Sequence, residues 1–275
     1  MTAAGLNPMD WLISARPEAA ARWGITVPSG FGCDLVDHPG EVGAGAEGFA
    51  VGDRVYGGAM AKAAADFAVV QTAPSMLYHL IHTPEGISDQ VAAALPTPGL
   101  TAAAALEAIE LRSGDTVLIG GAAGGVGVLA AQLAKLAGAR VIGTASPGTF
   151  EFLRELGAEP VEYGPGLADR VRALAPGGVT AATDLFNTET AEAALALRVR
   201  PERISTIAAG PNAPGGVRAA GGFDAEPADL ARITDAILAG KITTPIAATF
   251  PLERIRDAVT LQAGRHVHGK IVVAL

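Results

Sequence analysis

The stretch Thr116–Ser146, TVLIGGAAGGVGVLAAQLAKLAGARVIGTAS, decides the fold of this 275-residue chain. Its part from Thr116 to Ala134 carries no charged side chain, and a transmembrane helix needs about 20 mostly apolar residues. The glycines between Gly120 and Gly127 argue against a membrane span, because each costs a helix interior about 1 kcal/mol relative to alanine. The stretch is therefore expected to break at these glycines.

Divided there, the stretch predicts a strand, a turn, a helix and a second strand. Thr116–Ile119 is a short apolar run with β-branched residues, which is typical of a buried strand. From Val126 the apolar residues recur at helical spacing until Gly138, and Ala139–Thr144 begins a second strand. Such a βαβ unit is parallel and right-handed.

The turn itself indicates a ligand. Dinucleotide-binding folds place G-x-G-x-x-G between strand and helix, where the backbone approaches a pyrophosphate at the helix N-terminus. Here the matching positions are Ala122, Gly124 and Gly127. The alternative is a tight turn whose glycines serve only close packing. We predict that cofactor binding involves Gly121, Ala122, Ala123, Gly124, Gly125, Val126 and Gly127.

Composition narrows the function classes. Hydrophobic residues make up 49% of the chain, enough for one large or two moderate domains. The net charge of −8 disfavours a nucleic-acid partner, since phosphate binding requires a basic surface. A single cysteine excludes a disulfide framework or a Cys-rich zinc site. The N-terminus lacks a signal-peptide pattern, so a cytoplasmic protein is expected.

The rhythm of the chain changes at Pro96. Before it, Gly and Pro recur at short intervals, which favours short strands in a β-rich part. After it, helices and strands alternate as in a parallel sheet covered on both faces. The segments FPLERIRDAV and KIVVAL are strand-like and are expected to return to the first part. The expected helices are Thr101–Leu111, Phe150–Leu156, Leu167–Leu174 and Asp229–Ala239, and the expected strands are Pro160–Tyr163, Ala181–Phe186 and Ile204–Ala208.

The chain resembles the medium-chain dehydrogenase/reductase superfamily, in its zinc-free quinone oxidoreductase branch. The segments that carry the resemblance occur in the family's order: LNPMDW, VGDRVYG, AALPTPGLTA, VLIGGAAGGVG, LGAEPVEYG, FPLERIRDAV and GKIVV. The resemblance implies an α/β fold in which a Rossmann doubly wound parallel sheet (97–244) is joined to a GroES-like β-rich catalytic domain (1–96 and 245–275). It implies NAD(P)H-dependent reduction of a quinone or an α,β-unsaturated carbonyl compound, a small-molecule substrate, and leaves homodimer formation open.

A metal site is not expected. Zinc-dependent relatives carry a Gly-His-Glu element where this chain has Gly32, Cys33 and Asp34, and no further cysteine remains to complete a site. The five histidines, which show no H-x-x-x-H spacing, are His38, His79, His82, His266 and His268. Hydride transfer to an enone or quinone needs no metal, because the cofactor supplies the chemistry.

The predicted cofactor is NADPH. NAD-selective folds place an acid about 20 residues beyond the turn to bind the ribose 2′-hydroxyl, whereas here the second strand ends TASPG without an acid. The resemblance maps Ser146, Tyr163 and Arg265 to the adenosine-phosphate pocket, although the basic residue that relatives often carry shortly after the serine is missing. The alternatives are a core aromatic for Tyr163 and a solvated surface charge for Arg265.

The resemblance also maps Asn7 and Thr101 beside the nicotinamide and substrate. Alternatively, Asn7 is a turn residue before Pro8, Thr101 an N-cap of the following helix, and Asp10 another N-cap. No side chain is an evident proton donor, so solvent is expected to protonate the product enolate.

Two departures from the family pattern concern the β-rich domain. Pro39 follows DLVDH where relatives continue an apolar strand, so the strand is expected to be shortened. Relatives carry opening strands before the NPxD segment, and the GroES-like domain is therefore expected to be incomplete at its N-terminus, with exposed strand edges. We retain two other functional hypotheses: a trans-acting enoyl reductase of a biosynthetic pathway, and a catalytically impaired NADPH-binding protein.

Overall fold

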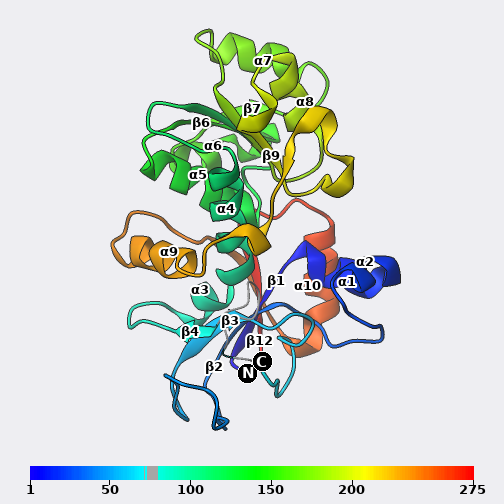
Figure 1. Ribbon diagram of the computed structural model, residues 1–275, viewed down its shortest axis with the longest axis vertical. Helices are drawn as coiled ribbons and strands as arrows, with labels where there is room; N and C mark the ends of the chain where they lie inside the picture. Colours follow the sequence, from blue (N-terminus) through cyan, green and yellow to red (C-terminus); the bar gives the residue numbers. More distant parts are fainter. Residues whose placement is uncertain (71, 73–79) are drawn as a thin grey trace. The chain divides into compact units, whose positions relative to one another are not determined.

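The computed structural model describes residues 1–70, 72 and 80–275 (Figure 1). It divides into two compact units. The first comprises Met1–Pro98, Glu226–Gly240 and Thr244–Leu275, and the second comprises Gly99–Ala225 and Lys241–Thr243. Within the described residues, each unit is built on its own six-stranded sheet.

The sheet of the second unit is entirely parallel. Its strands in spatial order are β10 (Arg218–Ala219), β9 (Ile204–Thr206), β8 (Ala181–Asp184), β5 (Thr116–Gly120), β6 (Arg140–Ala145) and β7 (Glu159–Glu162). The chain thus winds outward from β5 in one direction and returns to wind outward in the other, which is the doubly wound order of a Rossmann fold. The predicted fold class, a doubly wound parallel sheet plus a β-rich part, is confirmed.

Helices alternate with these strands: α4 (Pro96–Ala108), α5 (Gly125–Leu136), α6 (Phe150–Glu155), α7 (Leu167–Leu174) and α8 (Glu189–Ala196). A hydrophobic core joins Leu118, Ile142 and Ile204 of the sheet to Val171 of α7 and Ala191 of α8. The described residues also contain single 3₁₀ turns, of which the last belongs to the first unit: η1 (Pro147–Thr149), η2 (Pro201–Arg203), η3 (Gly210–Asn212), η4 (Pro214–Gly216), η5 (Gly222–Asp224) and η6 (Leu252–Arg254).

The predicted βαβ unit is confirmed as β5, α5 and β6. Leu118 and Ile119 are fully buried, as expected for a parallel strand covered on both faces. β8 is shorter than predicted and ends at Asp184. α4 is longer than predicted and begins at Pro96.

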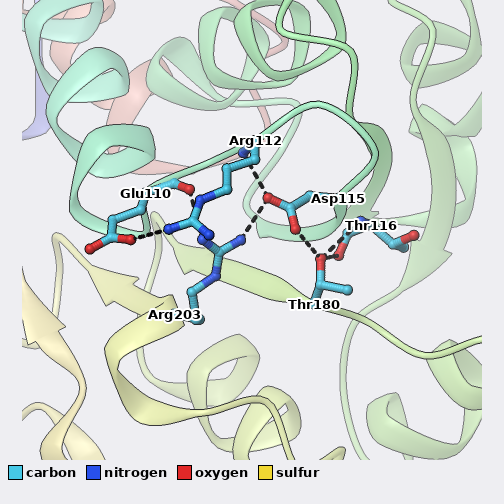
Figure 2. A network of polar contacts seen from close by, with 6 residues as sticks. All are labelled: Glu110, Arg112, Asp115, Thr116, Thr180 and Arg203. Atoms are coloured by element: carbon cyan, nitrogen blue, oxygen red, sulfur yellow. Dashed lines mark hydrogen bonds and ion pairs between the residues drawn. The ribbon is translucent and has the colours of Figure 1, made fainter.

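Charged side chains fasten the amino-terminal end of the β5 strand (Figure 2). Arg203 forms an ion pair of 2.6 Å with Asp115, and both side chains are largely buried, with exposures of 8% and 12%. Arg203 also donates to the carbonyl of Glu110, and Asp115 accepts from the hydroxyl of Thr180 at 2.7 Å. Hydrogen bonds from Thr180, Arg112 and Arg203 outweigh burial and hold the pKa of Asp115 below its ordinary value.

The sheet of the first unit is mixed. Its strands in spatial order are β11 (Ile246–Pro251), β12 (Lys270–Ala274), β1 (Ala3–Leu6), β2 (Asp34–Asp37), β3 (Val55–Gly58) and β4 (Leu80–His82). β11 and β12 are parallel and the other pairs are antiparallel. The two ends of the chain meet in this sheet, where Ala3 lies opposite Ala274 (Figure 1). β2 ends at Asp37, ahead of Pro39, as the missing N–H of a proline requires.

The helices of this unit are α1 (Pro8–Ala15), α2 (Pro17–Arg22), α3 (Asp89–Ala93), α9 (Asp229–Leu238) and α10 (Ile255–Ala263). The hydroxyl of the fully buried Tyr56 on β3 forms a 2.5 Å hydrogen bond with the hydroxyl of Thr234 on α9. Burial raises the pKa of Tyr56 to about 12, so this hydroxyl keeps its proton.

The prediction that FPLERIRDAV is strand-like is wrong beyond Pro251. Leu252, Ile255 and Val259 recur at helical spacing and pack against Leu6 and Ile271. Burial of that stripe against β1 and β12 favours a helix over a longer strand. None of the helices in the described part of the chain combines the length and apolar character that crossing a bilayer requires.

Candidate functional site

The glycine turn, Gly121–Gly127, joins β5 to α5 and depends on glycine unequally. Gly121 has a φ of +67°, a conformation that favours glycine. A Cβ on Gly127 would lie 2.2 Å from the carbonyl oxygen of Gly121, so the fold admits no side chain there. A Cβ on Gly124 would lie 3.4 Å from the same oxygen, at the edge of ordinary contact. Close packing therefore explains Gly127, whereas the packing around Gly124 does not by itself require a glycine.

The amino-terminal end of α5 can receive an anion. Gly124 is the N-cap, has no side chain to cap the helix, and the first turn contains no acidic residue. The first N–H groups of a helix have no intrahelical partner, and the helix dipole adds positive potential at this end. A phosphate at this position would accept hydrogen bonds from the backbone.

Strand β6 holds the turn in place. The N–H of Gly121 donates to the hydroxyl of Thr144 at 3.0 Å, and the N–H of Ala122 donates to the carbonyl of the same threonine at 3.2 Å. β6 ends at Ala145, and Ser146, which follows, forms a 2.9 Å hydrogen bond with the hydroxyl of Thr149. The residue directly after β6 is thus a serine, whose hydroxyl bonds that of the buried Thr149, and not a carboxylate.

Ser146 and Tyr163 occupy equivalent places at the ends of two neighbouring strands. Ala145 on β6 is in register with Glu162 on β7, so Ser146 and Tyr163 are the residues that directly follow two paired strand ends. The Tyr163 side chain is 48% exposed, and the alternative that it is a core aromatic is wrong. Arg265 is exposed, follows α10 with a φ of +57° and belongs to the first unit.

A loop that sequence reasoning missed lies next to the glycine turn. Asp184, fully buried at the end of β8, accepts hydrogen bonds from the N–H groups of Phe186, Asn187 and Thr190 at 3.0, 2.9 and 2.8 Å. Phe186 is 47% exposed, and a Cβ added to Gly121 would lie 3.2 Å from the Cβ of Phe186. β5 and β8 flank the switch point of the sheet, where doubly wound proteins bind ligands. The sequence signal that could have indicated this loop was Asp184, an aspartate at the end of a predicted strand and three residues before Asn187.

Thr101 lies inside α4, and the alternative that it is an N-cap is wrong. Its side chain is buried against η5, with the hydroxyl 3.1 Å from where a Cβ on Gly222 would lie. Asp10 is also not an N-cap: it is the third residue of α1 and accepts the N–H of the N-cap residue Asn7 at 2.7 Å.

Asn7 belongs to a buried polar cluster in the first unit, formed by Asn7, Asp10, Cys33, Asp34, Thr97 and Lys270. The Asn7 amide donates to Asp34 at 2.8 Å, and its oxygen accepts from the ammonium of Lys270 at 2.6 Å. Asn7 is 4% exposed, and these contacts fix both ends of its amide. Asp34 also accepts from the N–H and hydroxyl of Thr97 at 2.9 and 2.6 Å.

Burial shifts the pKa of each charged group in this cluster. It lowers the pKa of Lys270 and raises that of Asp34, while their mutual attraction opposes both changes. Burial raises the pKa of Asp10 to about 7, with a further contribution from the charge of Asp34. Burial, followed by the charge of Asp10, raises the pKa of the Cys33 thiol well above its ordinary range. Asp10 Oδ1 has no partner with hydrogen-bond geometry in the described part of the chain.

No group of three or more His, Cys, Asp or Glu residues within 1–70, 72 and 80–275 is placed to hold a metal ion. His38, His82, His266 and His268 lie in loops or at a strand end, and His79 lies outside the described residues. His82 stacks on Phe49 with ring centroids 5.0 Å apart.

Comparison with known families and proteins gives a consistent set of relatives. A family model described as a zinc-binding dehydrogenase matches residues 156–273. A quinone oxidoreductase of Pseudomonas aeruginosa is 38% identical over 156 residues, which is 55% of this chain and 46% of that protein. The dehydrogenase azaJ of Aspergillus niger is 32% identical over 245 residues, covering 78% of this chain and 70% of that protein. The chain thus spans about half the length of the P. aeruginosa relative.

Solved structures match over the whole chain. A quinone oxidoreductase of Coxiella burnetii superimposes with a TM-score of 0.81 at 29% identity, covering 100% of this chain and 88% of that one. A mycobacterial protein in complex with NADPH gives 0.82 at 28% identity, covering 100% and 89%. The CurK enoyl reductase gives 0.84 at 26% identity, covering 99% and 89%.

Proposed function

Because the chain belongs to the medium-chain dehydrogenase/reductase superfamily, in its quinone oxidoreductase-like branch, we propose that it is an NADPH-dependent oxidoreductase that reduces a quinone or an α,β-unsaturated carbonyl compound. In this proposal the second unit binds the dinucleotide, and the first unit is the GroES-like catalytic domain. The observation that carries the proposal is Gly124, a glycine that packing in the fold does not require at the N-cap of α5.

The residues around the glycine turn fit a nicotinamide dinucleotide. The backbone N–H groups at the start of α5 would hold the pyrophosphate, and Gly124 would allow it to approach. Ser146 and Tyr163 offer hydroxyl groups to a 2′-phosphate where β6 and β7 end, and Arg265 is proposed to contribute a positive charge. The absence of a carboxylate directly after β6 removes the repulsion that would reject that phosphate.

The bound cofactor supplies the hydride, and the protein supplies its position and surroundings. Asn7 and Thr101 are proposed to lie beside the nicotinamide and the substrate. The amide of Asn7 is already engaged by Lys270 and Asp34, so it can offer a substrate one remaining lone pair in a fixed direction. Solvent is proposed to protonate the enolate product.

The reaction is proposed to be zinc-independent, which is supported by the lack, among the described residues, of a group of three His, Cys, Asp or Glu side chains placed to hold a metal ion. Catalytic zinc needs three protein ligands and an open position. Cys33, the single cysteine of the chain, is 2% exposed, and burial favours its protonated thiol over the thiolate that zinc would bind.

A substrate panel tests the proposed activity. The purified 275-residue chain is mixed with NADPH and with quinones, free enones and enoyl thioesters, and loss of the reduced nicotinamide absorbance is followed. NADPH binding is measured separately by fluorescence. We expect turnover of a quinone or enone, whereas turnover restricted to enoyl thioesters would favour the enoyl reductase that the CurK similarity suggests. Binding without any turnover would identify an impaired NADPH-binding protein, and absence of binding would overturn the proposal.

A further inference from the structure

Tyr163 is carried by a sharply bent segment whose shape needs an explanation. The segment Glu162–Gly166, here called the Tyr163 turn, links the end of β7 to the start of α7. Gly164 and Gly166 have φ values of +96° and +81°, so the chain reverses through backbone conformations that favour glycine. Such glycines lower the cost of the bend but do not hold it in one conformation.

One side chain holds this turn. Arg170 on α7 donates to the four consecutive carbonyl oxygens of the turn, from Nε to Glu162 at 2.9 Å, from Nη1 to Pro165 at 2.8 Å, and from Nη2 to Tyr163 and Gly164 at 3.1 and 2.8 Å. A guanidinium has five N–H donors in a rigid plane, so these contacts use most of its capacity. Hydrogen bonds from a charged donor are stronger than neutral ones.

The turn is also fastened from its other side. The N–H of Gly164 donates to Glu189 Oε1, at the start of α8, at 2.6 Å. Arg170 forms no ion pair with a carboxylate in the part of the chain that the structure describes. The guanidinium is therefore committed to backbone carbonyls, an arrangement that fixes backbone shape.

The backbone that Arg170 fixes carries the exposed aromatic at the end of β7. Ala145 and Glu162 are in register, so Ser146 and Tyr163 each directly follow one of two paired strand ends, and the Ser146 hydroxyl forms a hydrogen bond with that of Thr149. The geometry points to Arg170 as a positioning residue for recognition of the 2′-phosphate: by holding the carbonyls of residues 162–165, it presents the Tyr163 hydroxyl beside Ser146. This inference rests on the proposed NADPH preference. It assigns to Arg170 on α7 a part in selecting the 2′-phosphate, because the basic residue that relatives often carry shortly after the serine is missing here.

The test compares two fragments of the cofactor that differ only by the 2′-phosphate. Affinities of the full chain for adenosine 2′,5′-bisphosphate and for 5′-AMP are measured by calorimetry, and their ratio reports on that phosphate alone. In Arg170→Met we expect the ratio to fall about tenfold, with 5′-AMP affinity nearly unchanged and the chain still folded. Arg170→Lys keeps the charge but cannot reach four carbonyls, so it should not restore the ratio.

Arg172 provides the matched control on the same helix. It is exposed, and its ion-pair partner among the described residues is Asp169, so Arg172→Met should leave the ratio unchanged. Tyr163→Phe should lower the ratio by itself, and adding Arg170→Met to it should lower the ratio little further, because both act through one hydroxyl.

The outcomes separate this inference from the proposed function. A wild-type chain that binds both fragments equally would overturn the NADPH preference and the role of Arg170 together. A wild-type preference that survives in a folded Arg170→Met variant, or that Arg170→Lys fully restores, would overturn only the positioning role. Loss of 5′-AMP binding in Arg170→Met would show a general structural role, and would also overturn it.

Discussion

The ammonium nitrogen of Lys270 lies 3.8 Å from Oδ2 of Asp34, with both side chains shielded from solvent at 3% and 0% exposure. Lys270 reaches this position from β12 and also donates to the carbonyl of Leu6 at 2.9 Å and to the amide oxygen of Asn7. The pair thus links β12, β1 and β2, three adjacent strands of the first unit's sheet. The same contacts fix the amide of Asn7, so the residue proposed for the active site depends on a buried charge pair for its orientation.

Breaking this pair should be costly. We expect Lys270→Met to lower the free energy of unfolding by about 3–5 kcal/mol, because the carboxylate of Asp34 would remain buried without its counter-ion. Urea unfolding at neutral pH measures the change. Lys241→Met, which alters an exposed lysine, should change stability by less than about 0.5 kcal/mol. The Lys270→Met/Asp34→Asn double variant should recover part of the lost stability. Equal stabilities of Lys270→Met and Lys241→Met would contradict the prediction.

The glycine turn separates a folding requirement from a binding requirement. Gly124→Val should fold, because a Cβ there meets only an oxygen at 3.4 Å, but should lower NADPH affinity at least about tenfold, or about 1.4 kcal/mol. Gly127→Ala should instead destabilise the second unit, because its Cβ would lie 2.2 Å from the Gly121 carbonyl. Fluorescence titration and thermal unfolding measure the two effects. Gly177→Val, at a position with open space, is the control, and unchanged NADPH affinity in folded Gly124→Val would disprove this pyrophosphate site.

Local patterns sufficed for the part of the fold that is built from neighbouring residues. The βαβ unit around the glycine turn follows from the spacing of apolar residues within Thr116–Ala145, and its strand and helix bounds lie within a residue of those expected. The helix α10 was missed because its apolar stripe becomes meaningful only against Leu6 and Ile271, far away in the sequence. Tertiary burial decided between two local conformations.

The candidate site divides in the same way. Gly124 could be predicted as a site residue from the glycine motif between a strand and a helix, and Ser146 from the family resemblance. The buried polar cluster could not, since Asn7 and Lys270 are 263 residues apart in sequence and meet only when β1 pairs with β12. Arg170 also escaped prediction, because an arginine within an amphipathic helix gives no sign that it bonds the preceding turn. The assignments themselves remain predictions that the variants above test.

The buried carboxyl of Asp10 should make stability depend on pH. Its folded pKa is raised to about 7, mainly by burial, with Asp34 adding to the shift and Cys33, the Asn7 N–H and Lys270 opposing it. The unfolded pKa is about 3.9. The folded state therefore binds the proton more tightly, so the contribution is present at low pH and is lost as the pH rises towards 7, by up to about 4 kcal/mol.

Asp10→Asn should remove that dependence. Asparagine keeps the oxygen that accepts the Asn7 N–H but does not titrate. Urea unfolding across about pH 4 to pH 8 should show the variant gaining stability relative to the wild type as the pH rises. Glu41→Gln, which replaces an exposed carboxylate, is the control for the substitution. Parallel pH profiles for the wild type and Asp10→Asn would contradict the prediction.

The ion pair between Arg203 and Asp115 is largely shielded from solvent (Figure 2). Arg203→Met should lower the free energy of unfolding of the second unit by about 3–5 kcal/mol, because Asp115 would keep its charge while losing its counter-ion. The matched control is Arg112→Met. Among the described residues its side chain forms an ion pair with Glu110 alone, on the surface, at exposures of 70% and 66%, so the loss in that variant should be below about 1 kcal/mol. The backbone N–H of Arg112 would still donate to Asp115 in that variant.

Added salt should reduce the small loss of stability in Arg112→Met and leave the loss in Arg203→Met nearly unchanged, since buried pairs are screened less. The pKa of Asp115 is held low in the folded state, so the cost of Arg203→Met should shrink as the pH falls through that value. Equal losses of unfolding free energy in Arg203→Met and Arg112→Met at neutral pH would show that the burial of Arg203 does not increase the contribution of its ion pair to stability.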